Sequence, residues 1–410
     1  MAMIRPFGAL RPAAEVAAAV SAVPYDVVST AEARELAAGN PLSFLHVSRP
    51  EIDLPDGTGA YSDAVYLKAK ESFQSLKRGA PLTVENEPSL YVYRLRMGDH
   101  SQAGVAACCS IDEYDSGVIK KHERTRKDKE DDRTRHMLAI SAQTGPVFLT
   151  YRGLDEINDL VAEAQESAPL YDFTAPDSVQ HTMWRLSETG AVAMSEAFEA
   201  VPSIYIADGH HRAASAARAR DVLRDANPGH RGDEEYNFFL AVLFTADDVR
   251  ILPYNRAVKD LDGITPRRFL ESLGGHFEVT RGAPRSPAAK GQISMRLGDE
   301  WYSLSLLAET TKPLGPIASL DASILQDRVL DPLLGIKDIR TNKRIDFVGG
   351  IRGPEELERM VADGRAAVAF SMYPVSLDEL MTISDASEIM PPKSTWFEPK
   401  LRDGLLSHLI

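Results

Sequence analysis

The sequence predicts a mixed α+β protein in which helices flank several β-sheets. Its composition is that of an ordinary globular protein, with 44% hydrophobic and 26% charged residues. Short apolar runs typical of strands alternate with helical patterns along the chain. No internal repeat or low-complexity tract interrupts this alternation, and 410 residues are enough for two or three domains.

The first of three expected domains covers residues 1–100 and is an N-terminal α/β region. Turn signals rich in proline, glycine and asparagine separate its short apolar runs. A helical pattern from Tyr61 to Leu76 ends near Gly79, where a helix stop is expected. The run from Leu90 to Leu95 that follows predicts a strand.

Residues 101–250 form the second expected domain, and residues 251–410 form a C-terminal α+β domain that includes a tail at 390–400. Short apolar runs predict strands in the second domain, and alanine-rich or amphipathic stretches predict helices. The expected strands span 103–111, 146–151, 203–207 and 236–244, and the expected helices span 154–167, 188–199 and 213–222.

Charge and cysteine content narrow the class of protein. A net charge of -14 argues against binding to a nucleic-acid backbone or an anionic membrane, because both require a cationic surface. The longest strongly apolar stretch, residues 238–244, is far too short to cross a bilayer. Cys108 and Cys109 are neighbours, which predicts two buried thiols and no disulfide framework. We therefore expect a soluble, cytoplasmic protein.

The segment Asp208-Gly209-His210-His211-Arg212 is the sharpest candidate site. Glycine permits a tight bend, and the N-terminus of the helix that follows offers N–H groups to an anion such as phosphate. Arg212 can bind phosphate oxygens through two donors, and Asp208 can hold a divalent ion. The competing interpretations are an Asp-Gly turn in which Asp208 caps the helix, and a zinc site that uses both histidines.

A second candidate is the pair His122-Glu123, which opens a strongly charged segment. Of the 17 residues from 120 to 136, 15 are charged or histidine. Glu123 could act as a general base on a hydroxyl if its surroundings raise its pKa. The alternative is a solvated helix face, which is the usual role of such a charge run.

The tail from 390 to 400 offers a third candidate, because Thr395 and Trp396 lie among charged residues. Such residues can line a small-ligand pocket, but they can equally dock the tail onto the body of the protein. The common nucleotide-binding fingerprints are missing, since the sequence contains neither a P-loop nor a G-x-G-x-x-G motif. A nucleotide would therefore have to bind through a different motif.

These motifs resemble a bacterial and archaeal family that carries the domain of unknown function numbered one thousand and fifteen. The matching stretches are 23–28, 40–50, 122–123, 205–212, 252–256 and 390–400. Two of the motifs are also similar to those of the free serine kinases of the ParB/sulfiredoxin-like group. That resemblance implies a ParB/sulfiredoxin-like catalytic core with inserted helices over residues 101–250.

The resemblance also implies roles for individual residues. Glu123 would be the base on the acceptor hydroxyl, and Asp208 would assist a magnesium ion or that hydroxyl. The segment Gly209 to Arg212 would hold nucleotide phosphates. By the same resemblance we expect His211 to take part in catalysis and His122 to contact the nucleotide.

The leading hypothesis is a magnesium-dependent small-molecule kinase that moves phosphate from ATP or ADP to a hydroxyl, with free L-serine as the first choice of acceptor. Its partners would be a nucleotide and a small hydroxylated metabolite. The protein could also associate as a homodimer. One alternative is a ParB-like nucleotide-binding regulator or NTPase. Another is a metal-dependent hydrolase that uses His122, Asp208, His210 and His211.

Overall fold

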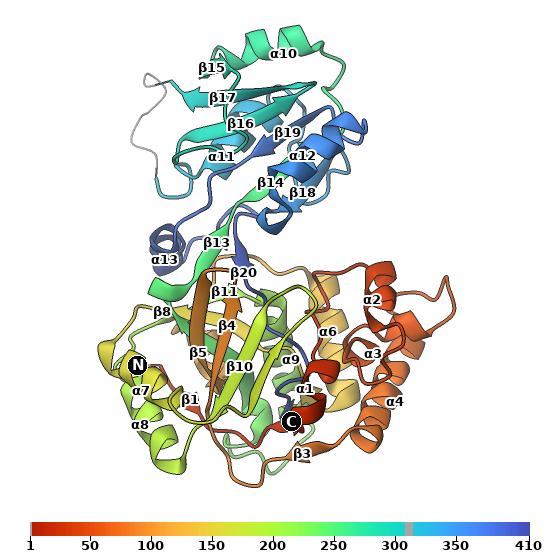
Figure 1. Cartoon of the computed structure of the whole chain (residues 1–410), viewed down its shortest axis with the longest axis vertical. Coiled ribbons are helices and arrows are strands. Elements are labelled where there is room, and N and C mark those ends of the chain that lie inside the picture. The colour runs from red at the N-terminus through yellow and green to blue at the C-terminus, as the bar shows by residue number, and fades with distance from the viewer. Residues whose placement is uncertain (1, 308–314) are drawn as a thin grey trace. The chain divides into compact units, whose positions relative to one another are not determined.

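The computed structural model describes residues 2–307 and 315–410 and confirms the mixed α+β class (Figure 1). The chain forms two compact units. Unit 1 comprises the residues up to 121, residues 125–249 and residues 399–410, and unit 2 comprises residues 122–124 and 250–398. Among the described residues, no helix combines the length and the apolar character needed to cross a membrane.

A nine-stranded sheet forms the centre of unit 1, in the order β6-β11-β8-β12-β5-β4-β10-β9, with β1 paired to β5. The pairs β6–β11 and β8–β12 are parallel, and the other pairs are antiparallel. The strands are β1 (Ile4–Arg5), β4 (Tyr91–Met97), β5 (His100–Ser110), β6 (Ile119–Lys120), β8 (Val147–Tyr151), β9 (Tyr171–Thr174), β10 (Gln180–Arg185), β11 (Ile204–Asp208) and β12 (Phe238–Thr245).

Helices and short strand pairs complete unit 1. The helices are α1 (Ala14–Val20), α2 (Thr30–Ala37), α3 (Leu45–Ser48), α4 (Asp63–Gly79), α5 (Ile111–Ser116), α6 (Lys127–Ile140), α7 (Asp155–Ala164), α8 (Glu188–Phe198) and α9 (His210–Asp225). β2 (Leu10–Pro12) pairs with β3 (Leu82–Val84), and β7 (Ala142–Gln143) pairs with β21 (His408–Leu409). Short 3-10 turns lie at Pro50–Asp53, Glu235–Asn237 and Ala246–Asp248.

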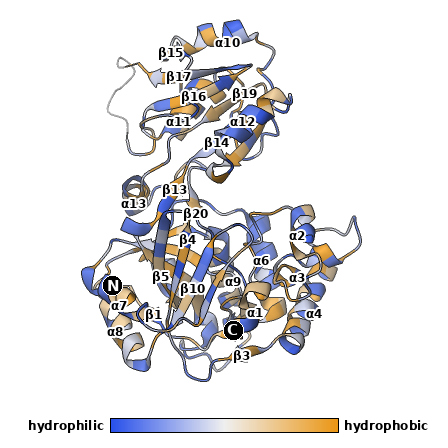
Figure 2. Ribbon diagram, in the orientation of Figure 1, coloured by the Kyte–Doolittle hydropathy of each residue, from blue (hydrophilic) through white to orange (hydrophobic). Residues whose placement is uncertain are grey.

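Two apolar cores hold unit 1 together. One lies against the large sheet and includes Leu149, Ile206 and Leu243, and the other joins α4 to the N-terminal segments through Phe44 and Phe73. Figure 2 shows hydrophobic and hydrophilic stretches on the surrounding helices, as expected for helices that cover a core on one side.

Helix α6 is partly buried, so the charged segment is more than a solvated face. Asp132, Thr134 and His136 are all buried, at 5–6% exposure. The hydroxyl of Tyr66 donates to Asp132 at 2.9 Å, and the His136 Nε2 bonds to the Val47 carbonyl at 2.7 Å. The charges of α6 therefore hold the N-terminal segments in place, in addition to being solvated.

Unit 2 contains an antiparallel six-stranded sheet in the order β15-β17-β16-β19-β14-β18. The strands are β14 (Tyr254–Val258), β15 (Phe277–Arg281), β16 (Gln292–Leu297), β17 (Glu300–Leu306), β18 (Ile345–Gly349) and β19 (Val368–Ser371), and β13 (Arg250–Leu252) pairs separately with β20 (Trp396–Glu398). The helices are α10 (Pro266–Leu273), α11 (Asp321–Leu325), α12 (Gly353–Ala362) and α13 (Leu377–Asp385), with a π-helical turn at Gln326–Leu330 and a 3-10 turn at Gly350–Arg352.

Candidate functional site

The predicted strand, turn and helix around Gly209 are confirmed. Strand β11 ends at Asp208, and α9 begins at His210. Gly209 caps the helix in the left-handed conformation, with a φ of 97°. A Cβ there would meet Arg212 Cζ at 3.3 Å and Val147 Cα at 3.4 Å. The bend therefore favours glycine, because other residues rarely adopt this φ.

Two cations lie beside the carboxylate of Asp208. The Arg212 Nη2 donates to Oδ2 at 2.9 Å, and the Lys400 Nζ lies 3.6 Å from Oδ1. Arg212 is itself buried, and its Nη1 donates to the Pro146 carbonyl. The Asp208 side chain keeps 31% of its surface exposed, so it can still meet a ligand.

Three carboxylates keep the buried Arg212 side chain protonated. Burial by itself lowers the pKa of this guanidinium, but Asp26, Asp208 and Asp403 together raise the pKa above its ordinary value. Arg212 is therefore a fixed cation at neutral pH. Because it is committed to Asp208, its main effect is to position that carboxylate at the end of β11.

His211 joins the first turn of α9 to the start of α6. Its Nε2 accepts a hydrogen bond from the backbone N–H of Arg126 at 3.0 Å. Arg126 is the N-cap of α6, so the N-termini of two long helices lie close together. Both helix ends carry partial positive charge, and both histidines of the motif belong to this region.

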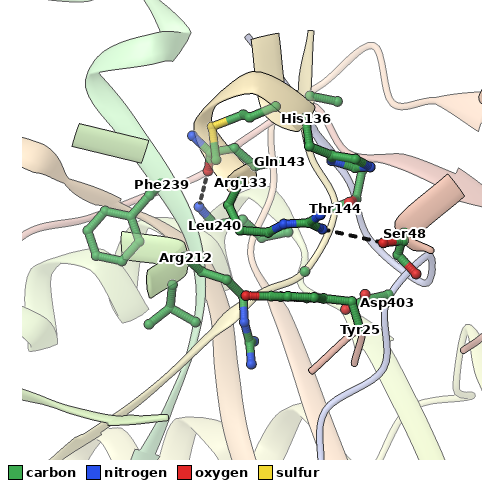
Figure 3. Close-up of a pocket in the computed structure, with 14 residues that line it drawn as sticks. Tyr25, Ser48, Arg133, His136, Gln143, Thr144, Arg212, Phe239, Leu240 and Asp403 are labelled. Atoms are coloured by element: carbon green, nitrogen blue, oxygen red, sulfur yellow. Dashed lines mark hydrogen bonds between the residues drawn. The ribbon is translucent and has the colours of Figure 1, made fainter. Parts of the chain in front are cut away.

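A cavity of about 50 Å³ adjoins the turn in unit 1 (Figure 3). Polar side chains from segments far apart in the sequence line it. Within the wall, the Arg133 Nη1 donates to the Ser48 carbonyl at 3.3 Å. The lining residues are Tyr25, Ser48, Arg133, His136, Met137, Ala142, Gln143, Thr144, Gly145, Val147, Arg212, Phe239, Leu240 and Asp403.

Two titratable groups in this wall have shifted pKa values. Burial raises the pKa of Asp403 to about 7, although the cations Arg212 and Arg133 oppose the rise. Burial also lowers the pKa of His136 to about 4. At neutral pH the imidazole is therefore uncharged, and the carboxyl group is close to half ionised.

His122, Glu123, Thr395 and Trp396 belong to unit 2, whereas Asp208 to Arg212 belong to unit 1. His122 is buried, and its carbonyl accepts from the Met390 N–H at 2.9 Å. Trp396 packs within unit 2, with its ring centroid 5.1 Å from that of Tyr254. The roles of these four residues at the turn stay predictions.

The sequence interpretation assigned no role to four residues beside the turn. Tyr25 and Asp403 line the cavity, Asp26 lies 3.9 Å from Arg212, and Lys400 lies beside Asp208. Tyr25 and Asp26 belong to the matching stretch 23–28, and Lys400 ends the stretch 390–400. Membership in these matching stretches is the signal by which Tyr25, Asp26 and Lys400 could have been found from the sequence. Asp403 lies outside every matching stretch.

The residues beside the turn offer carboxylate oxygens to a metal ion. Among the residues that the structure describes, no group of three histidine, cysteine or acidic side chains could hold a metal ion. Magnesium usually binds through one or two carboxylates together with substrate phosphates, so it needs no such group. Asp208 could supply one carboxylate, and the Asp26 carboxylate lies 3.9 Å from the same arginine.

The sequence matches the family described as "Protein of unknown function (DUF1015)" over residues 4–323. No curated protein matches it. Free serine kinase in complex with AMP is 14% identical, with a TM-score of 0.35, over 74% of this chain and 91% of that chain.

Two further solved structures are similar at the same level. A conserved hypothetical protein from Pyrococcus furiosus is 14% identical, with a TM-score of 0.36, over 74% of this chain and 94% of that chain. C-terminally truncated SbnI from Staphylococcus aureus is 13% identical, with a TM-score of 0.38, over 73% of this chain and 85% of that chain.

Proposed function

The chain belongs to the DUF1015 family, and we propose that it is a small-molecule kinase. It transfers a phosphoryl group from ATP or ADP to a hydroxyl of a metabolite, with free L-serine as the first candidate. The likeness of its His-Glu and Asp-Gly-His-His-Arg motifs to those of free serine kinases supports this choice over the regulatory and hydrolytic alternatives.

The bend at Gly209 is the observation that carries the proposal. The left-handed glycine turns the chain sharply from β11 into a helix of 16 residues. The first N–H groups of such a helix have no partner within the helix, and its dipole favours an anion there. The nearby start of α6 adds a second positive helix end. Terminal phosphates of a nucleotide would bind at this place.

Phosphoryl transfer needs charge stabilisation and positioning more than covalent chemistry from the protein. The acceptor oxygen forms the new bond to phosphorus as the bond from phosphorus to the leaving oxygen of the nucleotide breaks. Glu123 takes the proton of the acceptor hydroxyl. Asp208 is positioned by Arg212, and a magnesium ion held there with the nucleotide would neutralise developing phosphate charge.

Chain connectivity supports Glu123 as the base. Lys121 and Thr125 flank its segment, and both belong to unit 1. Strand β6 ends at Lys120 and runs parallel to β11, with Lys120 opposite Tyr205. Glu123 follows β6 by three residues, and Gly209 follows β11 directly.

Phosphorus NMR of the purified protein tests the reaction class. The sample contains magnesium, either ATP or ADP, and a pool of hydroxylated amino acids and hydroxy acids. We expect a new phosphoester resonance that depends on the pool and on magnesium. Release of inorganic phosphate at the same rate with and without the pool would instead support a nucleotide hydrolase.

A further inference from the structure

The cavity beside the turn contains hydrogen-bond acceptors that the protein leaves unused. Asp403 is 3% exposed and lines the cavity, and the causes of its raised pKa are burial and charges that act through space, with no hydrogen bond among them. Its electrostatic neighbours Arg212, Arg133 and Arg402 act through space. A buried carboxyl group without a donor is costly, so native structures normally supply one.

Two more groups in the cavity wall have hydrogen-bonding capacity that the protein leaves unused. The Oγ of Ser48 is buried and has no hydrogen-bond partner in the described structure. His136 bonds to the Val47 carbonyl through Nε2. A carbonyl only accepts, so Nε2 carries the proton and Nδ1 is an acceptor. Because His136 bonds to Val47 through Nε2, its Nδ1 is available to accept.

The cations in the wall already use most of their donors within the protein. Arg133 donates to Asp132 at 2.9 Å and to the Ser48 carbonyl, and its guanidinium carbon lies 4.2 Å from the centre of the Tyr25 ring. Arg212 donates to Asp208 and to the Pro146 carbonyl, but its Nε has no hydrogen-bond partner in the described structure. Besides the Arg212 Nε, the unused groups of the wall are the carboxyl group of Asp403, the Oγ of Ser48 and the Nδ1 of His136, all of which can accept a hydrogen bond, and this set fits a ligand that carries O–H and N–H donors.

We propose that this cavity is the acceptor subsite of the kinase, and that it binds the donor-rich end of a small amino alcohol or polyol through Asp403, Ser48 and His136. The assignment rests on the proposed function. A cavity of about 50 Å³ holds roughly three to five water-sized groups, which suits a compact molecule of a few non-hydrogen atoms.

The position of the cavity supports this assignment. Arg212 belongs both to its wall and to the turn, because one amino group of its guanidinium bonds to Asp208. Gly145 leaves room for Asp403, since a Cβ there would lie 2.9 Å from the Asp403 Oδ1. A molecule held by Asp403 therefore lies one side chain away from the carboxylate that ends β11.

Binding measurements on the full-length protein test the subsite separately from catalysis. L-serine, ethanolamine and glycerol serve as probes in titration calorimetry without nucleotide, and ADP is titrated in a parallel series. The variants are Asp403→Asn, which keeps the size of the side chain, and Ser48→Ala, which removes a hydroxyl that the fold leaves unpaired. Ser62→Ala is the matched control, because Ser62 is another buried, unpaired hydroxyl but lies outside the cavity wall.

We expect at least one probe to bind the wild type, and both cavity variants to weaken that binding about tenfold or more. The Ser62→Ala variant should bind like the wild type, and ADP affinity should be unchanged in all four proteins. Ser48→Ala keeps the test decisive if Asp403→Asn folds poorly.

Two results would overturn the assignment: no probe binds the wild type, or every variant binds as the wild type does. Either would mean that the cavity holds only water. Failure of the kinase proposal has a different signature. In that case the probes bind and respond to the variants, but no phosphoester forms from them with ATP or ADP.

Discussion

In the proposed reaction, Glu123 is the residue on which the chemistry depends most. In the Glu123→Gln variant the acceptor hydroxyl keeps its partner but loses its base. We expect turnover to fall by roughly 10²- to 10⁴-fold, whereas ADP affinity stays within about twofold. Rate measurements with calorimetric titration check this. Glu388→Gln, an exposed change also in unit 2, is the control, and unchanged turnover in Glu123→Gln would remove Glu123 from the mechanism.

Asp403 gives the fold a pH dependence of known sign. Burial raises its pKa from 3.8 to about 7 in the folded state, so folding favours the protonated form. Its contribution to stability is full below pH 3.8 and is lost as the pH rises to about 7. Urea unfolding across this range should therefore show wild type losing stability relative to Asp403→Asn, with no further loss above pH 7.5 or so. A constant difference would contradict the assigned pKa.

Residue patterns predicted the turn well and the cavity not at all. Gly209, two histidines and an arginine signal a site within five consecutive positions, so the sequence alone indicates it. Tyr25, His136 and Asp403 come together only through long-range packing, and each looks ordinary in its own segment. The charge run 120–136 likewise gives no sign that Asp132 is buried, because its hydrogen-bond partner Tyr66 lies in the distant helix α4.

At the scale of elements, the junction of β11 and α9 should depend on glycine. Gly209→Ala places a Cβ on a left-handed residue and close to Arg212, which we expect to lower the free energy of unfolding by ~1–2 kcal/mol. Gly79→Ala is the control, because a Cβ there meets nothing within 4 Å and φ is not positive. The control should be neutral or slightly stabilising. Equal unfolding midpoints for both variants would contradict this account of the turn.

Elements with strong local signals were predictable. The helix expected from Tyr61 to Leu76 is observed as α4, and the strand expected at 203–207 is β11, displaced by one residue. Sheet order was not predictable, because β6 is only two residues long and its pairing with β11 joins segments about 85 positions apart. Such pairings depend on tertiary packing, which local propensity does not encode.

At the scale of the whole molecule, each unit has its own apolar core, which predicts separate unfolding transitions. The three tryptophans report on them, since Trp184 lies in unit 1 and Trp301 and Trp396 lie in unit 2. Fluorescence of Trp184→Phe therefore follows unit 2, and that of the double variant Trp301→Phe/Trp396→Phe follows unit 1. We expect different urea midpoints, checked against circular dichroism. Superimposable transitions would mean that the chain unfolds as one unit.

Asp208 offers the most direct test of the central claim that the turn at Gly209 supports phosphoryl transfer. The measurement is the magnesium-dependent rate of phosphoester formation by phosphorus NMR, for wild type and Asp208→Asn, with circular dichroism to verify folding. We predict a measurable rate for the wild type that disappears when magnesium is chelated, and no detectable transfer by the folded variant. A folded Asp208→Asn protein with a normal magnesium-dependent rate would contradict the assignment of the site.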